Sequence, residues 1–277
     1  MSKPLIINRL FCTPEIMAAR FAVLLPLAGK VPWPSDPAAR HEHERLTGIV
    51  HKMWRTRIST LYDSEWQAIT GKLGVYPCSY CNPIGLVSTH HKRWCHQTTV
   101  CPWCYGREVV RVYRGFSNIL SDATSIEPLT LYGFRTSLHD SVCNARLSLK
   151  QMLKSDRKRW HCRTSALQPA AGYLQLVAEP VNKSAWSVRR VGLMLLGRDV
   201  KLPHWFGDVF ITREYPDIEF CPWKLAWFVG RVMRYPRHLM TCRPSKFMRL
   251  VKARQGIRAS ATYGLMRSLP RYALDDV

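Results

Sequence analysis

Five of the ten cysteines of this chain lie within residues 78–104, and their spacing is the strongest constraint in the sequence. The first two form one C-x2-C pair, and the last two form a second pair after nineteen intervening residues. Each pair turns tightly enough to aim two thiolates at one ion, and two pairs complete the tetrahedron that zinc prefers. The spacing therefore predicts a zinc site whose ligands are Cys78, Cys81, Cys101 and Cys104, with Cys95 or His96 as alternates for one of them.

A disulfide cluster and a set of ordinary buried thiols are the two other interpretations of these cysteines. The paired spacing disfavours ordinary burial. Disulfides need an oxidising compartment, and the N-terminal residues do not favour export, because Glu15 and several prolines interrupt the short apolar run. We therefore expect a cytoplasmic protein with reduced thiols. Four thiolates leave no open position on zinc, so the metal is expected to be structural.

The charge of the chain is extreme, with 41 Lys and Arg against 19 Asp and Glu and a net charge of +22. Such an excess repels itself unless an anionic partner offsets it. Nucleic acid is the expected partner, because phosphates that Lys and Arg neutralise release counterions and supply affinity for any sequence. A membrane partner is not expected, since no apolar run approaches the roughly 18 residues that a spanning helix needs.

Two amphipathic helices are predicted on either side of the cysteines. Apolar residues recur every three or four positions from Leu46 to Leu61 and again from Val109 to Leu120. The second helix carries Arg107, Arg111 and Arg114 on its other face, so a basic helix leaves the cysteine cluster. These patterns divide the chain into a helical N-terminal region (1–75), a zinc-binding module with its basic helix (76–122) and an α+β nucleic-acid-binding domain (123–277).

The last of these regions has the pattern of an antiparallel sheet with flanking helices. Residues 129–136, 171–180 and 186–197 have the composition of strands, and the short connection between the last two suits a hairpin. A helix is expected after Asp140, where an Asp can cap it, and another over residues 221–235. The order strand, helix, strand, strand, helix favours an α+β fold.

The segment RWCHQTTVCPWCYGRE (93–108) resembles the cysteine-rich lead-in of the rolling-circle replication initiators of plasmids and phages, the HUH endonuclease class. In that family a C…CPxC run, followed by arginines and a helix, precedes the first strand of the nuclease domain. The predicted elements downstream of residue 128 follow the family's order. The resemblance implies an initiator-like fold and a protein that binds an origin or single-stranded DNA, with DNA favoured over RNA.

The chain departs from this family at the residues that carry its chemistry. The family's nuclease uses two histidines on one strand to bind a divalent cation, Mg²⁺ or Mn²⁺, which activates a phosphate for attack by a tyrosine. The matching strand here reads Arg190-Val191-Gly192, and Trp227 and Phe228 stand where the tyrosine is expected. The resemblance therefore favours binding over nicking. Tyr235, seven residues beyond Phe228, is the one candidate for a displaced nucleophile, and His41-Glu42-His43 is a weak match to the histidine motif.

Basic residues interleaved with aromatic ones dominate the C-terminal third, a pattern that suits phosphate contacts beside stacked bases. A solvated basic helix face is the alternative for any one of them. The candidate nucleic-acid contacts are Lys92, Arg93, Arg107, Arg111, Arg189, Arg190, Arg231, Arg234, Arg237, Lys246, Arg249, Lys252, Arg254 and Arg258.

Three hypotheses for the function follow. The first is a zinc-containing, strongly basic DNA-binding protein related to replication initiators. The second is an active nickase or primase-type enzyme, which would need a divalent cation and either Tyr235 or clustered carboxylates. The third is a scaffold for RNA or protein assembly with structural zinc. The carboxylates available to the second hypothesis are Asp199, Asp208, Glu214, Asp217 and Glu219.

Overall fold

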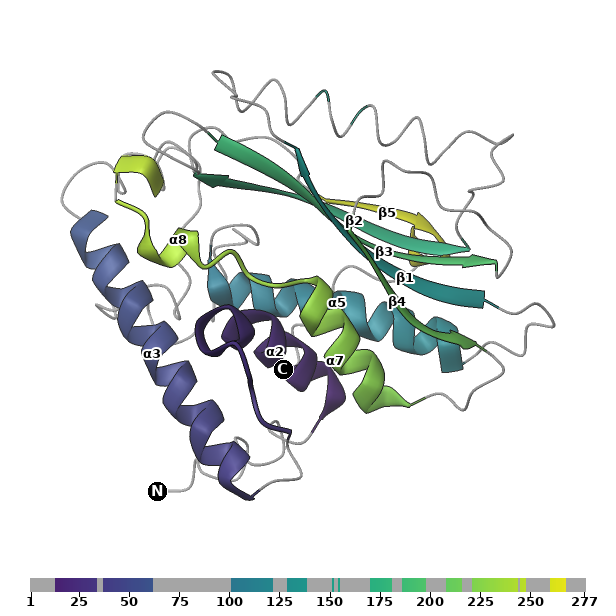
Figure 1. Ribbon diagram of the computed structural model, residues 1–277, viewed down its shortest axis with the longest axis horizontal. Helices are drawn as coiled ribbons and strands as arrows, with labels where there is room; N and C mark the ends of the chain where they lie inside the picture. Colours follow the sequence, from purple (N-terminus) through teal and green to yellow (C-terminus); the bar gives the residue numbers. More distant parts are fainter. Residues whose placement is uncertain are drawn as a thin grey trace, which may run out of the picture.

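An antiparallel sheet of five strands forms the centre of the computed structural model (Figure 1). The order of the strands across the sheet is β4-β1-β3-β2-β5, and every neighbouring pair is antiparallel. The structure describes residues 13–33, 37–61, 101–121, 129–138, 151, 154, 170–180, 186–197, 208–215, 221–243, 245–247 and 260–267.

The strands are β1 (Leu129–Leu138), β2 (Ala171–Pro180), β3 (Trp186–Gly197), β4 (Asp208–Tyr215) and β5 (Ser260–Gly264). Strands β2 and β3 are consecutive in the chain and pair from Ala171 opposite Leu195 to Pro180 opposite Trp186, which confirms the expected hairpin. The α+β content and the antiparallel sheet with flanking helices are likewise as expected.

Both faces of the sheet are apolar. Side chains alternate between the faces along a strand, so a continuous apolar run such as Val191–Leu196 buries residues on each side. Val191, Leu193 and Leu195 share one core with the helices. Met194 and Leu196 point to the opposite face and are buried as well. The near-continuous hydrophobic character of β3 therefore reflects burial on both faces, as it does in parallel sheets.

Four helices, α2, α3, α5 and α7, lie on one side of the sheet, in layers (Figure 1). Helices α5 (Pro102–Ser121) and α7 (Pro222–Val232) pack on the strands, α2 (Pro14–Ala28) packs against both of them, and α3 (Pro37–Leu61) contacts α2. Each of these four helices begins with proline, whose fixed φ suits the first helical position, where an N–H would have no partner within the helix. Two short segments, α8 (His238–Thr241) and the 3-10 turn η2 (Leu265–Arg267), complete the described elements.

Helix α2 approaches α7 closely because both helices carry small residues at the crossing. A Cβ atom added to Gly230 on α7 would lie 2.5 Å from the Cβ of Phe21 and 2.8 Å from the carbonyl oxygen of Ala18. The second of these atoms is backbone and cannot rotate away. At Gly230 only a hydrogen therefore fits between the two helices, and the position fixes how deeply α2 sits.

The two helices predicted from the apolar stripes 46–61 and 109–120 form as α3 and α5, and the helix predicted over 221–235 forms as α7. Helix α2 and strands β4 and β5 were not predicted from the sequence. The helix expected after Asp140 lies outside the described residues apart from two helical positions, 151 and 154. A single core takes buried side chains from all three of the regions into which the sequence was divided.

No helix within the described part of the chain is long and apolar enough to cross a membrane.

The crossing of α2 and α7 predicts opposite effects for two glycine substitutions. Gly230→Ala should lower the free energy of unfolding by about 1–3 kcal/mol, because the added methyl group overpacks a rigid contact. Gly48→Ala is the matched control: Gly48 is exposed on α3 with nothing within 4 Å of an added Cβ. This second change should stabilise the protein by about 0.5–1 kcal/mol through helix propensity. Urea unfolding of both variants tests the pair, and equal effects would contradict the packing argument.

Candidate nucleic-acid interface

The positive charge of the chain is concentrated in its C-terminal part. No Asp or Glu stands between Glu219 and Asp275. Of the described basic residues in this stretch, six are exposed and two, Arg234 and Lys246, are half-buried; the exposed ones are Lys224, Arg231, Arg237, His238, Arg243 and Arg267. Six of the eight run from the end of α7 to just after α8, and we call them the α7–α8 basic surface: Arg231, Arg234, Arg237, His238, Arg243 and Lys246.

The acidic residues of the first three helices do not offset this surface, because each of them pairs with an arginine of the same three helices. On α3, Arg40 contacts Glu44 at 3.3 Å and Arg45 contacts Glu42 at 2.6 Å. The other two pairs involve α5: Glu108 with Arg111 at 2.6 Å, and Glu15 of α2 with Arg114 at 3.3 Å. The carboxylates of α2, α3 and α5 are therefore committed within the fold.

Helix α2 anchors the chain just after α7 through a hydrogen bond that a proline makes possible. Pro26 lies inside α2 and has no N–H, so it cannot donate to the carbonyl of Ala22 four residues earlier. The backbone N–H of Tyr235 donates to that carbonyl instead, at 2.8 Å. The position of the α7–α8 connection therefore follows from an interruption of the hydrogen bonding within α2.

Two tyrosines of α5 hold α7 at both of its ends. The hydroxyl of Tyr113 donates to the carbonyl of Pro222 at 3.2 Å, and the hydroxyl of Tyr105 donates to the carbonyl of Met233 at 3.0 Å. The second bond satisfies a carbonyl at the C-terminal end of α7, where no helical N–H remains to donate. The basic residues after α7 thus start from a backbone that two helices fix in place.

Arg231 and Arg234 bring two guanidinium groups close together at this end of α7. Burial lowers the pKa of Arg234, and the nearby positive charge of Arg231 lowers it further. Two cations that the fold holds near each other favour the approach of an anion, since the anion relieves their repulsion.

The arginines expected to form a basic face on α5 lie inside the protein or partly so. Arg111 donates two hydrogen bonds to Glu108, at 2.6 and 2.9 Å, and its guanidinium carbon lies 5.8 Å from the ring centre of Tyr173. Arg107 lines a hollow of about 230 Å³ between α2, α3 and α5. Helix α5 lies between the sheet and α2, so its arginines make contacts within the protein and are not a fully exposed basic face.

A buried network joins α5 to the sheet at this point. The hydroxyl of Tyr173 on β2 donates to Glu108 at 2.9 Å. Burial raises the pKa of Tyr173 well above its usual value, and the charge of Glu108 adds to this, so the phenol stays protonated. The pKa of Arg111 is raised as well: burial lowers it, but the hydrogen bonds and charge of Glu108 outweigh that effect. In this network, the Glu108 carboxylate accepts hydrogen bonds from both the Tyr173 hydroxyl and the Arg111 guanidinium.

The two candidate arginines of β3 differ in their access to solvent. Arg190 is only 7 % exposed and Arg189 is half-buried. Arg190 is thus too deeply placed to grip a phosphate at the surface, and the prediction of a contact there is disfavoured. The remaining candidates, Lys92, Arg93, Arg249, Lys252, Arg254 and Arg258, lie outside the described residues.

Of the predicted zinc ligands, two lie among the described residues. Cys101 precedes α5 and Cys104 lies in its first turn; both are buried, at 1 % and 2 % exposed, and neither is in a disulfide. Cys78, Cys81, Cys95 and His96 lie outside the described residues. Within the described ranges no group of three metal-binding side chains comes together.

The candidate nucleophile Tyr235 is part of the core. It is 1 % exposed, and its ring packs against that of Tyr105 with centres 5.3 Å apart. Its backbone N–H is the group that bonds Ala22. A phenol in this position is not accessible to a phosphate, so the geometry favours a structural role for Tyr235.

The backbone positions of Asp208 and Glu214 on β4 lie too far apart to favour a shared metal site. Asp208 lies opposite Arg135 and Glu214 lies opposite Thr130, five positions apart on β1. At the spacing of a strand this separates their backbones by roughly 17 Å, whereas two-metal sites hold their ions about 4 Å apart. Asp199, Asp217 and Glu219 lie outside the described residues.

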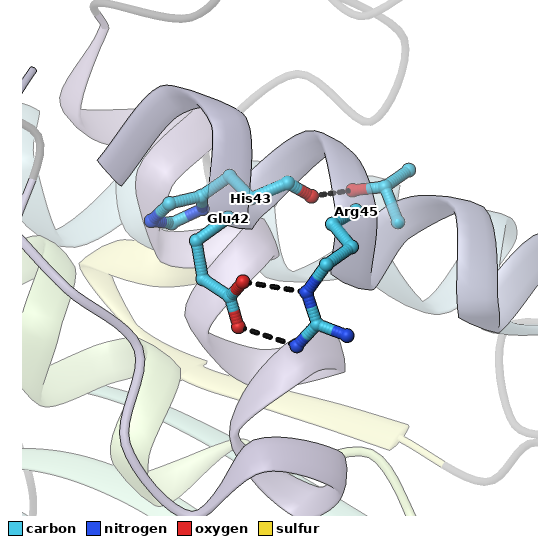
Figure 2. Close-up of polar contacts among 4 residues, drawn as sticks. Glu42, His43 and Arg45 are labelled. Carbon is cyan, nitrogen blue, oxygen red and sulfur yellow. Dashed lines mark hydrogen bonds and ion pairs between the residues drawn. The ribbon is translucent and has the colours of Figure 1, made fainter. Parts of the chain in front are cut away.

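The segment His41-Glu42-His43 is helical and does not form a metal-binding pair. Two positions apart on an α-helix, side chains point to nearly opposite sides. His41 is exposed, whereas His43 is fully buried and its Nε2 lies 3.0 Å from the carbonyl oxygen of Pro32. Figure 2 shows Glu42 paired with Arg45, and the carbonyl of His43 accepting a hydrogen bond from Thr47.

Comparison of the chain with family models, with curated proteins and with solved structures found no match.

Three exposed basic residues of the acid-free stretch were not among the predicted contacts: Lys224, Arg243 and Arg267. The feature that could have identified them is the lack of any carboxylate from residue 220 to residue 274. Trp33, which is 44 % exposed beside α7, was not predicted as a site residue either.

The burial of His43 predicts a dependence of stability on pH. Burial lowers its pKa below the ordinary value of 6.5, and the contact with Pro32 offsets this only in part. As the pH falls, the unfolded chain therefore takes up a proton that the folded chain does not. Stability from neutral His43 is fully present above about pH 6.5 and is lost below it.

We expect His43→Gln to lose less stability than the parent protein when urea unfolding at about pH 7.5 is compared with that at about pH 5.5. Glutamine can still donate to the carbonyl of Pro32. His41→Gln is the control, because His41 is exposed on the same helix, and it should leave the difference unchanged. If His43→Gln and the parent lose the same amount, the histidine does not titrate as argued.

Proposed function

We propose that the protein binds nucleic acid through the α7–α8 basic surface. One observation carries the proposal: a stretch without a single carboxylate brings exposed arginines to a backbone that α2 and α5 hold in place. Phosphates are the ligands that such a surface favours, because their neutralisation releases counterions. A net charge of +22 is consistent with a polyanionic partner.

DNA is the proposed partner, in preference to RNA, and an origin or single-stranded DNA is the proposed target. Support comes from the resemblance of residues 93–108 to the lead-in of replication initiators. The described residues favour binding rather than nicking, since Tyr235 is buried and the acids of β4 are far apart. We propose a structural Zn²⁺ as the only cofactor, with a Mg²⁺ or Mn²⁺ requirement tied to nuclease activity alone.

The proposed zinc site would stabilise the start of α5. Cys101 and Cys104 supply two neighbouring reduced thiols at this point, and the cytoplasmic location that we propose would keep them reduced. Zinc at this turn would attach the cysteine stretch to the helix that carries Tyr105 and Tyr113. The metal would thus act on the basic surface only through α5.

Nucleic-acid binding predicts a steep dependence of affinity on salt. Fluorescence anisotropy with a labelled thymidine oligonucleotide should show affinity falling by orders of magnitude between about 50 and about 200 mM salt. The double variant Arg231→Gln/Arg237→Gln should reduce the slope of log affinity against log salt by roughly 1.4, the value for two phosphates of a single strand.

The matched control is Arg40→Gln/Arg45→Gln, which removes the same charge from α3, where both arginines already pair with glutamates. It should leave the slope nearly unchanged. An affinity that is insensitive to salt, or equal slopes for the two double variants, would overturn the proposed surface.

The zinc proposal predicts one zinc per chain in protein purified without added metal, measured by elemental analysis. Cys101→Ser should lose the metal and unfold at a lower urea concentration, because metal binding and folding are coupled. Cys242→Ser is the control: this cysteine is half-buried and lies outside the cysteine stretch. Zinc-free parent protein together with an unchanged midpoint for Cys101→Ser would rule the site out.

A further inference from the structure

An exposed indole lies beside the α7–α8 basic surface. Trp33, in the connection from α2 to α3, has 44 % of its surface exposed to solvent. Its ring centre lies 5.8 Å from that of Trp227 on α7, with the planes 42° apart. A single exposed apolar side chain is ordinary on a protein surface, so a role for Trp33 depends on its neighbours: a second indole beside it and the arginines that follow on α7.

Other aromatic rings hold Trp33 in place. Phe21 on α2 makes edge-to-face contacts with both indoles, with ring centres 5.6 Å from Trp33 and 5.0 Å from Trp227. Phe21 is fully buried, and it is the residue against which Gly230 packs. The exposed ring is therefore fixed by the same crossing of α2 and α7 that fixes the basic surface, and little conformational freedom remains to be lost on binding.

Arginine side chains continue from this aromatic pair along α7. Arg231 follows Trp227 by four residues, which places it on the same face of the helix, about 6 Å along the axis. Side chains on a helix lean toward its N-terminus, so Arg231 leans toward the turn of Trp227. Arg234 comes three residues later and is electrostatically coupled to Arg231. Arg231 thus follows Trp227 at helical spacing, and Arg234 comes just after the end of α7.

We propose that Trp33 is a stacking platform for an unpaired base, and that Arg231 and Arg234 bind the phosphates next to it. This inference rests on the proposed function and specifies it: the ligand is single-stranded nucleic acid whose bases are free to stack. A base stacked on an aromatic ring adds affinity without sequence preference, because every base has a π-face. A duplex has no unpaired base to offer and would use the cations alone.

The test compares two oligonucleotides of equal length and charge, one of thymidines and one in which every base is missing. We expect the parent protein to bind the thymidine oligonucleotide more tightly, by about 5- to 150-fold, the range measured for one stacked base. Trp33→Leu should remove most of this preference and leave binding of the abasic oligonucleotide unchanged. Trp33→Phe, which keeps a ring, should retain part of the preference.

Arg231→Gln should weaken binding of both oligonucleotides by the same factor, because it removes a phosphate contact. Leu265→Ala, at another exposed apolar side chain, should change neither. Circular dichroism checks that each variant is folded. If Trp33→Leu does not fold, Trp33→Phe still tests the role of the ring.

Two results overturn the stacking inference: a preference for thymidine that survives in Trp33→Leu, or a loss of affinity in Trp33→Leu that is equal for both oligonucleotides. In either case the proposed function stands, provided that Arg231→Gln weakens binding. If Arg231→Gln changes nothing, or neither oligonucleotide binds the parent, the proposed function itself fails. Trp33 and its neighbours would then be a surface for a protein partner.

Discussion

The hydrogen bond from the N–H of Tyr235 to the carbonyl of Ala22 is the interaction on which the functional part of the structure depends. It exists because Pro26 cannot donate to that carbonyl within α2. The bond joins a helix near the start of the chain to the connection after α7, more than two hundred residues later. Gly230 permits the close approach that the bond needs. The position of the basic surface, the burial of Tyr235 and the fixed ring of Trp33 all follow from how α2 and α7 cross.

Charge is distributed unevenly over this framework. The carboxylates of α2, α3 and α5 are paired with arginines, and Glu108 also accepts from the buried Tyr173, so these acids do not offset the basic surface after α7. The C-terminal part has no acids for more than fifty residues. Under the proposed function, a polyanion would approach the α7–α8 basic surface, where the charge of Arg231 acts on Arg234.

The spacing of apolar residues along the sequence predicted the elements that have one side in the core and another side toward solvent. The helix stripes of α3 and α5 and the hairpin of β2 and β3 fall within a few residues of their expected bounds, because each repeats apolar residues at helical or strand spacing. Helix α2 was missed because it buries residues on several sides, between α5, α7 and α3, and so has no polar face to reveal a period. Strand β4 was missed because it is an edge strand with charged residues, which resemble a polar loop.

The sequence by itself determined the net charge, the paired cysteines, the hairpin and the helix-forming stripes, since these depend on composition and on neighbours along the chain. Only the tertiary structure decided which basic residues face solvent. Arg111 and Arg190 look equivalent to Arg231 and Arg237 in the sequence, yet the first two lie partly or wholly inside and the last two are exposed. The difference arises because α5 and β3 are covered by other elements, whereas Arg231 on α7 and Arg237 after it stand on sides that the described elements leave uncovered. Which side of an element is covered depends on residues far away in the chain.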